Sequence, residues 1–153
     1  MTSLQSRPLF RLSMTLHPTL EVGATPAGGR RVFLVSGGRF EGDRISGEVL
    51  ERGGSDLLLA RADGSAQQDV RVLLRSDDGA LIVMTYRGVR HASDAVAARI
   101  AAGEAVPGTE YYLRTAPFFE TASERHGWLN RIVSVGVGER TADGVVYDLF
   151  EVL

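Results

Sequence analysis

The chain has 153 residues, of which 44% are hydrophobic and 24% charged, and its net charge at pH 7 is -2. These values fit a single globular domain over residues 1–153 and argue against nucleic acid as a partner, because phosphate binding needs clustered basic residues. The absence of Cys excludes disulfides, thiolate metal sites and cysteine nucleophiles. No apolar run is long enough for a membrane helix or a signal peptide, so we expect a cytoplasmic protein with no membrane partner.

The first half of the chain predicts a series of short strands. From Pro8 to Val22, apolar residues such as Phe10, Leu12 and Met14 alternate with polar ones, which is the period of a half-buried strand. The Gly-rich run at 37–42 predicts a bend. Further strands, separated by turns rich in Gly, Asp and Ser, are expected at 30–36, 43–51, 57–61, 68–75 and 80–87.

The second half predicts one short helix and three more strands. Ser93 is a good N-cap for a helix that would end at Gly103. The last strands are expected at 111–116, 128–137 and 145–152. Many short strands with turn signals at roughly 8–12-residue spacing predict an all-β antiparallel barrel or sandwich.

The last two strands are apolar on both faces, which a half-exposed sheet does not require. The runs at 129–137 and 145–152 therefore need cover on the outside as well as the inside. The single helix is too small to provide that cover. We therefore predict a homodimer or a higher homo-oligomer that buries this surface.

Several segments in chain order resemble a known family. They are Val22-Gly23, GGRFEG at 37–42, DVR at 69–71, DDGALI at 77–82, YYLRTAP at 111–117, FFET at 118–121 and WLN at 128–130. Together they resemble domain-of-unknown-function family 3237, also called uncharacterised protein family 0311. The resemblance implies a single calycin- or lipocalin-like antiparallel β-barrel, usually oligomeric, with no agreed activity or catalytic residues. Relatives often carry an aromatic residue after the position of Asp56, where this chain has Leu57, so its pocket would differ in shape.

The first candidate ligand site is a charged pair on one strand. Asp69 and Arg71 are two residues apart and so share a face, and the planar guanidinium of Arg71 suits a ligand carboxylate or enolate. The opposite face, with Val70, Val72 and Leu74, is apolar and would face inward in an ordinary barrel. The alternative is therefore a solvated pair on the outside.

Aromatic and amide residues give the remaining candidates. Tyr112 and Arg114 share a strand face near several other rings, and could enclose a flat ligand or simply belong to the core. Trp128 and Asn130 could line the same interior, although Asn130 could equally close a turn. Tyr86 completes the ligand-binding set.

Three functions remain open at this point. The first is a barrel that binds a small aromatic or polyketide-like ligand, and the second is a cofactor-independent isomerase, cyclase or hydrolase that uses Asp69, Tyr86 or Glu124 as acid or base, with Glu124 and His126 as a possible pair. The third is a structural oligomer with a filled barrel. We expect no cofactor and no metal, because the three His are far apart in the sequence, and the ligand itself is not specified.

A simple criterion separates the first two functions. An enzyme requires a carboxylate to converge with Tyr or Arg in one enclosed pocket and to have a perturbed pKa. A wholly apolar cavity would exclude acid–base chemistry. We further expect Arg71, Arg114 and Trp128 to share the interior of the barrel.

Overall fold

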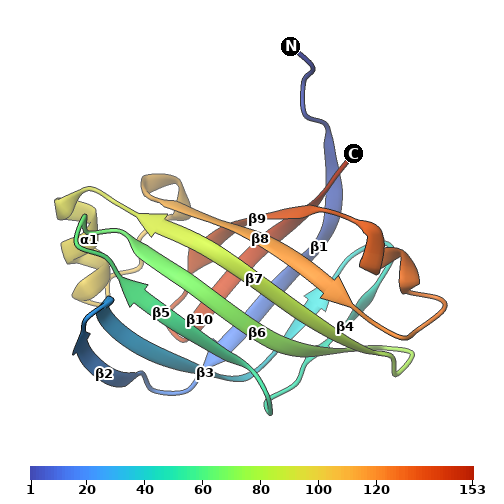
Figure 1. Ribbon diagram of the computed structural model, residues 1–153, viewed down its shortest axis with the longest axis horizontal. Helices are drawn as coiled ribbons and strands as arrows, with labels where there is room; N and C mark the ends of the chain where they lie inside the picture. Colours follow the sequence, from blue (N-terminus) through green and yellow to red (C-terminus); the bar gives the residue numbers. More distant parts are fainter.

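The computed structural model describes residues 1–153 and shows an antiparallel β-barrel with one short α-helix (Figure 1). Its strands are β1 (Ser6–Leu16), β2 (Leu20–Thr25), β3 (Gly28–Glu41), β4 (Ser46–Val49), β5 (Ser55–Ala60), β6 (Ala66–Ser76), β7 (Leu81–His91), β8 (Tyr112–Glu120), β9 (Ser134–Arg140) and β10 (Gly144–Val152). The helices are α1 (Asp94–Ala101) and the 3-10 turns η1 (Gly108–Glu110) and η2 (Gly127–Arg131).

The sheet closes on itself through β1, which pairs with β10 on one side and with β3 on the other. From β10 the order runs through β9, β8, β7 and β6 to β4 and β3. Two positions in the wall are shared by broken strands: β4 and β5 both bridge β3 to β6, and β2 pairs with β3 beyond the end of β1. The predicted all-β barrel with one short helix is confirmed.

The interior is built by alternation along each strand. On β6, Val70, Val72 and Leu74 are buried, and the residues between them are exposed or half-buried. Large side chains such as Phe40 and Met84 fill the middle of the barrel without measurable exposure. The barrel is therefore solid at its centre, and any open space lies toward its ends.

The prediction of a bend at the Gly-rich segment 37–42 is wrong, because most of this segment continues β3 within the sheet. Gly37 and Gly38 stay within β3, with φ angles of 144° and 149°. A Cβ atom on Gly38 would lie 2.0 Å from the carbonyl oxygen of Ser13. Gly38 therefore allows β1 and β3 to approach closely, which is the contact that closes the barrel.

The helix begins as predicted, whereas the strand expected at 128–137 is wrong in its first half. Ser93 caps α1 by accepting a hydrogen bond from the backbone N–H of Val96, and no residue of α1 is buried. Residues Gly127–Arg131 form η2 instead of a strand, and β9 starts only at Ser134. No helix has the length and apolar character that crossing a bilayer requires.

Candidate functional site

A cavity lies inside the barrel at the end next to α1, on the left of Figure 1. Its volume is about 40 Å³, enough for about three water molecules. A wider vestibule of about 240 Å³ lies between the mouth of the barrel and α1. The cavity is lined by apolar side chains, namely Met14, Leu16, Phe33, Val35, Leu58, Val70, Leu113 and Val145.

Polar side chains converge on this apolar cavity from three strands. Asp56 comes from β5, Gln68 from β6 and Tyr86 from β7. The Gln68 side-chain amide donates a hydrogen bond of 2.9 Å to the hydroxyl of Tyr147, whose ring centroid lies 5.4 Å from that of Tyr86. The backbone N–H of Asp69 donates to the Asp56 carboxylate at 3.1 Å. The site is therefore a buried carboxylate beside an amide and two phenols.

Asp56 is the carboxylate of this cluster, and the fold alters its pKa. Burial raises the pKa of its carboxyl from 3.8 to about 6, although the hydrogen bonds from Asp69 and Gln68 oppose the shift. A carboxyl with a pKa near neutrality can both accept and release a proton under ordinary conditions. Asp56 is therefore suited to be a general acid or base.

The two tyrosines are suited to a different role. Burial raises the pKa of Tyr86 well above its usual value of 10.0 and raises the pKa of Tyr147 to about 12. Both phenols therefore stay protonated at neutral pH and can act as hydrogen-bond donors. The side-chain oxygen of Gln68 is buried without a hydrogen-bond partner and packs against Gly88, where a Cβ atom would lie 2.4 Å from it.

Gly138 on β9 makes room for Tyr147. The two residues are paired across β9 and β10, and a Cβ atom on Gly138 would lie 2.5 Å from Cε1 of the Tyr147 ring and 2.7 Å from Cδ2 of Leu113. This close approach explains why the strand-like run at 134–140 contains inward glycines. The position of the Tyr147 ring and its hydroxyl therefore depends on residue 138 being a glycine.

Gly138→Ala is expected to destabilise the fold by about 1–3 kcal/mol, because the added methyl group overpacks the core against an aromatic ring. Urea unfolding of the variant and of Gly127→Ala measures this effect. Gly127 is a matched control, because a Cβ atom there would meet no atom within 4 Å. Equal stability of Gly138→Ala and the wild type would show that Tyr147 is not confined as described.

The structure places one residue of the predicted ligand set, Tyr86, at the cavity. Asp69 and Arg71 lie on the outer face of β6, where their side chains are 3.5 Å apart and the Arg71 side chain is 66% exposed. Tyr112 and Arg114 lie on the outer face of β8, with the guanidinium 4.9 Å from the ring centroid. This outward placement was the alternative left open for Asp69 and Arg71.

The predicted residues of the loop before β9 lie at the opposite end of the barrel. Trp128 stacks against the guanidinium of Arg44 at 3.9 Å from the ring centroid. The Asn130 side chain exchanges two hydrogen bonds with the backbone of Thr121, and so closes a turn. The expectation that Arg71, Arg114 and Trp128 share the interior is therefore wrong, because two lie in the outward phase of their strands and the third lies on η2.

The sequence does carry a signal for the residues that were missed. Gln68 is in phase with the buried Val70, and Tyr147 with the buried Val145 and Leu149. Asp56 is likewise in phase with the buried Leu58 on β5. A polar residue in the inward phase of an apolar strand marks the interior more reliably than a conspicuous aromatic run does.

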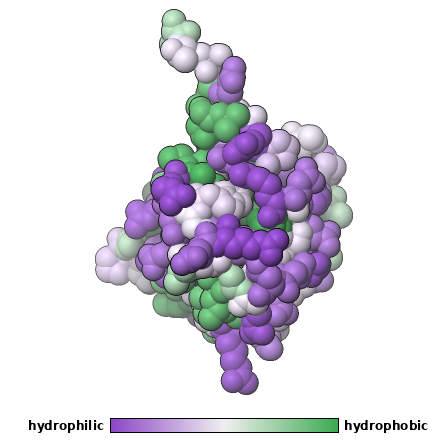
Figure 2. Space-filling model, turned by 90° about the vertical axis from the view of Figure 1, so that its right-hand side faces the viewer, coloured by the Kyte–Doolittle hydropathy of each residue, from purple (hydrophilic) through white to green (hydrophobic).

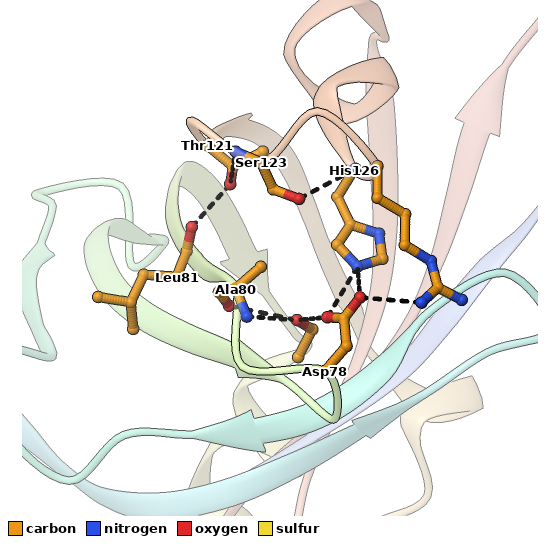
Figure 3. Close-up of polar contacts among 8 residues, drawn as sticks. Asp78, Ala80, Leu81, Thr121, Ser123 and His126 are labelled. Atoms are coloured by element: carbon orange, nitrogen blue, oxygen red, sulfur yellow. Dashed lines mark hydrogen bonds and ion pairs between the residues drawn. The ribbon is translucent and has the colours of Figure 1, made fainter.

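A second polar cluster lies at the end away from α1 (Figure 3). The Nε2 atom of His126 lies 3.0 Å from both carboxylate oxygens of Asp78, and Arg125 contacts the same carboxylate at 3.1 Å. The hydrogen bond from Ser76, followed by the one with His126, holds the pKa of Asp78 down at about 2. His126 thus pairs with Asp78 and not with the exposed Glu124 that we had considered.

This second cluster fixes neighbouring loops to one another. Ser123 accepts a hydrogen bond from the His126 backbone, and the Thr121 hydroxyl donates to the carbonyl of Leu81, so the loop before η2 is tied to the β6–β7 hairpin (Figure 3). Hydrophilic residues cover much of this end of the molecule (Figure 2). No group of three or more His, Cys, Asp or Glu side chains is placed to hold a metal ion.

The fold and the cavity define a closed β-barrel with a solid centre and a polar site at one open end. The chain belongs to the family described as protein of unknown function (DUF3237), whose model matches residues 4–152. The family resemblance drawn from the sequence is thereby confirmed.

Curated relatives and solved structures agree with this assignment. The chain is 30% identical to a UPF0311 protein of Rhodopseudomonas palustris over 151 residues (99% of this chain, 98% of the relative), and 28% identical to the hydroalkoxylation enzyme PhnH of Penicillium herquei over 142 residues (88% and 79%). A crystal structure from R. palustris superposes with a TM-score of 0.95 at 29% identity, covering 100% of both chains. A β-barrel-like protein of Acinetobacter baumannii gives 0.86 at 36% identity, covering 100% of this chain and 98% of the other.

Proposed function

We propose that this protein is a cofactor-independent acid–base enzyme that acts on a small organic molecule at the open end of the barrel. The observation that carries the proposal is the convergence of Asp56, Gln68 and Tyr86 on one largely apolar cavity, with the Tyr147 hydroxyl hydrogen-bonded to Gln68 behind its wall. A carboxylate with a raised pKa beside a phenol supports acid–base chemistry in this cavity. The apolar lining limits the number of water molecules in the cavity, and hydrogen bonds to a bound substrate are stronger where water is excluded.

The reaction that fits this site is the addition of a hydroxyl group across a carbon–carbon double bond. The relative from P. herquei is described as a hydroalkoxylation enzyme, and this name supports the same class of reaction here. In such an addition the substrate O–H bond and the π bond break while a C–O and a C–H bond form. Asp56 would accept the hydroxyl proton as oxygen attacks and return a proton to carbon, so no redox partner is needed.

The neighbouring groups would orient the substrate for this step. Tyr86 lines the cavity and would donate a hydrogen bond to an oxygen atom of the substrate, since its phenol stays protonated. The Gln68 amide would hold the Tyr147 hydroxyl in place behind the cavity wall. The cavity holds only the reacting end, and the vestibule under α1 accommodates the rest.

Incubation with 2-prenylphenol in deuterated buffer tests the proposed reaction. We expect a cyclic ether that differs from the substrate only by the new C–O bond and by one deuterium on a carbon of the former double bond. Mass spectrometry and NMR detect this product. The rate should change through about pH 6, where Asp56 titrates. Conversion no faster than in buffer, or a rate that does not depend on pH in this range, would count against the acid–base role.

Small-molecule binding without catalysis is the second candidate, and the same cavity favours it. The third candidate, a wholly filled barrel, is supported only for the middle of the molecule, where Phe40, Met84 and Leu74 leave no space. A binding protein would take up 2-prenylphenol without converting it. The reaction experiment therefore separates the first two candidates directly.

We infer that the protein forms a homodimer or higher homo-oligomer through the outer face of β8 and β9. Phe118 and Val133 are 53% and 54% exposed there, and Val135 and Val137 are about two-fifths exposed on the same face. Contiguous apolar residues on an outer sheet face are typical of an interface between subunits. Their aliphatic and aromatic composition suits a second copy of the same face.

Sedimentation equilibrium of the wild type and of Val135→Glu measures this association. The wild type is expected to sediment as a dimer or larger at micromolar concentration, and Val135→Glu as a monomer, because a desolvated charge opposes association. Val22→Glu, on the exposed part of β2, is the matched control and should associate like the wild type. A monomeric wild type would contradict the interface.

A further inference from the structure

Two arginines whose side chains form no salt bridge or hydrogen bond within the protein lie at the boundary between the cavity and the vestibule. Arg90 at the end of β7 and Arg140 at the end of β9 line both spaces. Most arginines of the chain form ion pairs with carboxylates, but Arg90 and Arg140 do not. Neither guanidinium donates a hydrogen bond to another protein group, although both residues are only partly exposed.

The positive charges are crowded together at this boundary. Burial lowers the pKa of Arg90, and the neighbouring cations Arg140 and Arg31 lower it further. Arg31 has its own carboxylate, Glu21, at 2.8 Å. The Asp56 carboxylate offsets part of the charge of Arg90, so a net positive charge remains on the pair Arg90 and Arg140. Like charges held close together in a partly buried position repel one another, and an anion bound between them relieves that repulsion.

The surfaces on either side of the arginines differ in character. Toward the interior lie Phe33, Leu58 and Val145, and the Arg140 guanidinium sits 5.8 Å from the centroid of the Phe33 ring. Toward the outside lies the wider vestibule under α1. A ligand with an apolar reacting end and one charged group would match this arrangement, with the reacting end in the barrel and the charge at its mouth.

We propose that Arg90 and Arg140 form an oxyanion subsite that holds a carboxylate group of an aromatic substrate. The inference rests on the proposed function and names the class of its substrate. Guanidinium groups bind a carboxylate in two-point geometry, which fixes both its position and its plane. The subsite would orient the substrate so that its hydroxyl group reaches Asp56, while the arginines themselves transfer no proton.

NMR titration with two matched probes tests the subsite. We use 4-hydroxybenzoate and its neutral analogue 4-hydroxybenzamide, and follow amide shifts of residues around the cavity. The benzoate is expected to bind at least about tenfold more tightly than the amide, because a charged hydrogen bond contributes about 1.5–3 kcal/mol. Added salt should weaken binding of the benzoate and leave the amide unaffected.

Substitution of the arginines should remove the preference for the benzoate. Arg90→Gln and Arg140→Gln are each expected to weaken benzoate binding about tenfold, with little effect on the amide. Arg114→Gln, which removes a guanidinium from the outer wall, is the matched control and should bind like the wild type. The amide spectrum of each variant verifies that the barrel is folded.

The outcomes distinguish this inference from the proposed function. Equal binding of benzoate and benzamide, or benzoate affinity unchanged in both cavity variants, would overturn the subsite. Asp56→Asn should keep or increase benzoate affinity, because it removes a negative charge near the ligand. Turnover that depends on Asp56, together with equal binding of benzoate and benzamide, would contradict the subsite but not the acid–base function.

Discussion

Asp56→Asn is expected to reduce turnover of 2-prenylphenol by about 10²–10⁴-fold, which is the usual contribution of a general acid or base. Asn keeps the size and a hydrogen-bonding oxygen, so it can still accept the bond from the Asp69 backbone. It cannot accept and return a proton. Asp77→Asn is the matched control, because Asp77 is an exposed carboxylate at the end away from α1 and its loss should leave the rate unchanged.

The same substitution should stabilise the fold above the pKa of Asp56. The folded pKa of about 6 lies above the ordinary value of 3.8, so the folded protein binds this proton more tightly than the unfolded chain does. The contribution of Asp56 to stability is therefore fully present below about pH 4, and it falls by at most about 3 kcal/mol as the pH rises through about 6. An uncharged Asn escapes this loss.

Urea unfolding at about pH 4 and about pH 8 measures the difference. Asp56→Asn and the wild type should be similarly stable at the lower pH, and the variant should be more stable at the higher pH by up to about 3 kcal/mol. If Asp56→Asn were destabilised equally at both pH values, the Asp56 carboxylate would have a structural role and its pKa would not be raised in the folded protein.

His126→Ala is expected to lower the free energy of unfolding by about 2–4 kcal/mol, because it removes a buried ring and leaves a cavity at the end away from α1. His126 is 4% exposed and contacts Asp78 at 3.0 Å. The hairpin that carries Asp78 would then lose its link to η2. Binding and turnover at the open end should be unaffected in the folded fraction.

Urea unfolding at neutral pH tests this result, with Glu124→Ala as the control. Glu124 is exposed, and its loss should change stability by no more than about 0.5 kcal/mol. Should His126→Ala abolish turnover while the stability stays at the wild-type level, the cluster at this end would be functional and the assignment of the active end would be reversed.

The barrel could be predicted from the sequence because each strand carries its own period-2 pattern and each turn its own Gly or Asp. The predicted strand boundaries are wrong where tertiary contacts override the local sequence pattern. Gly37 and Gly38 resemble a bend, yet both stay in β3 and pair with β1, and Gly38 packs directly against the backbone of Ser13. Residues 127–131 resemble a strand, yet the hydrogen bonds of Asn130 with Thr121 hold them in a turn.

The site was harder to predict because it is assembled from residues far apart in the sequence. Asp56 follows Gly53-Gly54-Ser55, so the sequence predicts a turn at this residue, whereas the structure places it at the inward-facing start of β5. Arg90 and Arg140 are likewise ordinary in the sequence, and only closure of the barrel brings them to one mouth. Tyr112, in the aromatic run at the start of β8, is predicted from the sequence to bind the ligand but lies on the outer face of the barrel.

The most direct test of a poised acid–base group at the open end is a ¹³C NMR titration of the Asp56 side-chain carboxyl in the folded protein. Our account predicts a midpoint at about pH 6, with the Asp56→Asn spectrum identifying the signal. A midpoint near 3.8, the value of an ordinary aspartate, would contradict it.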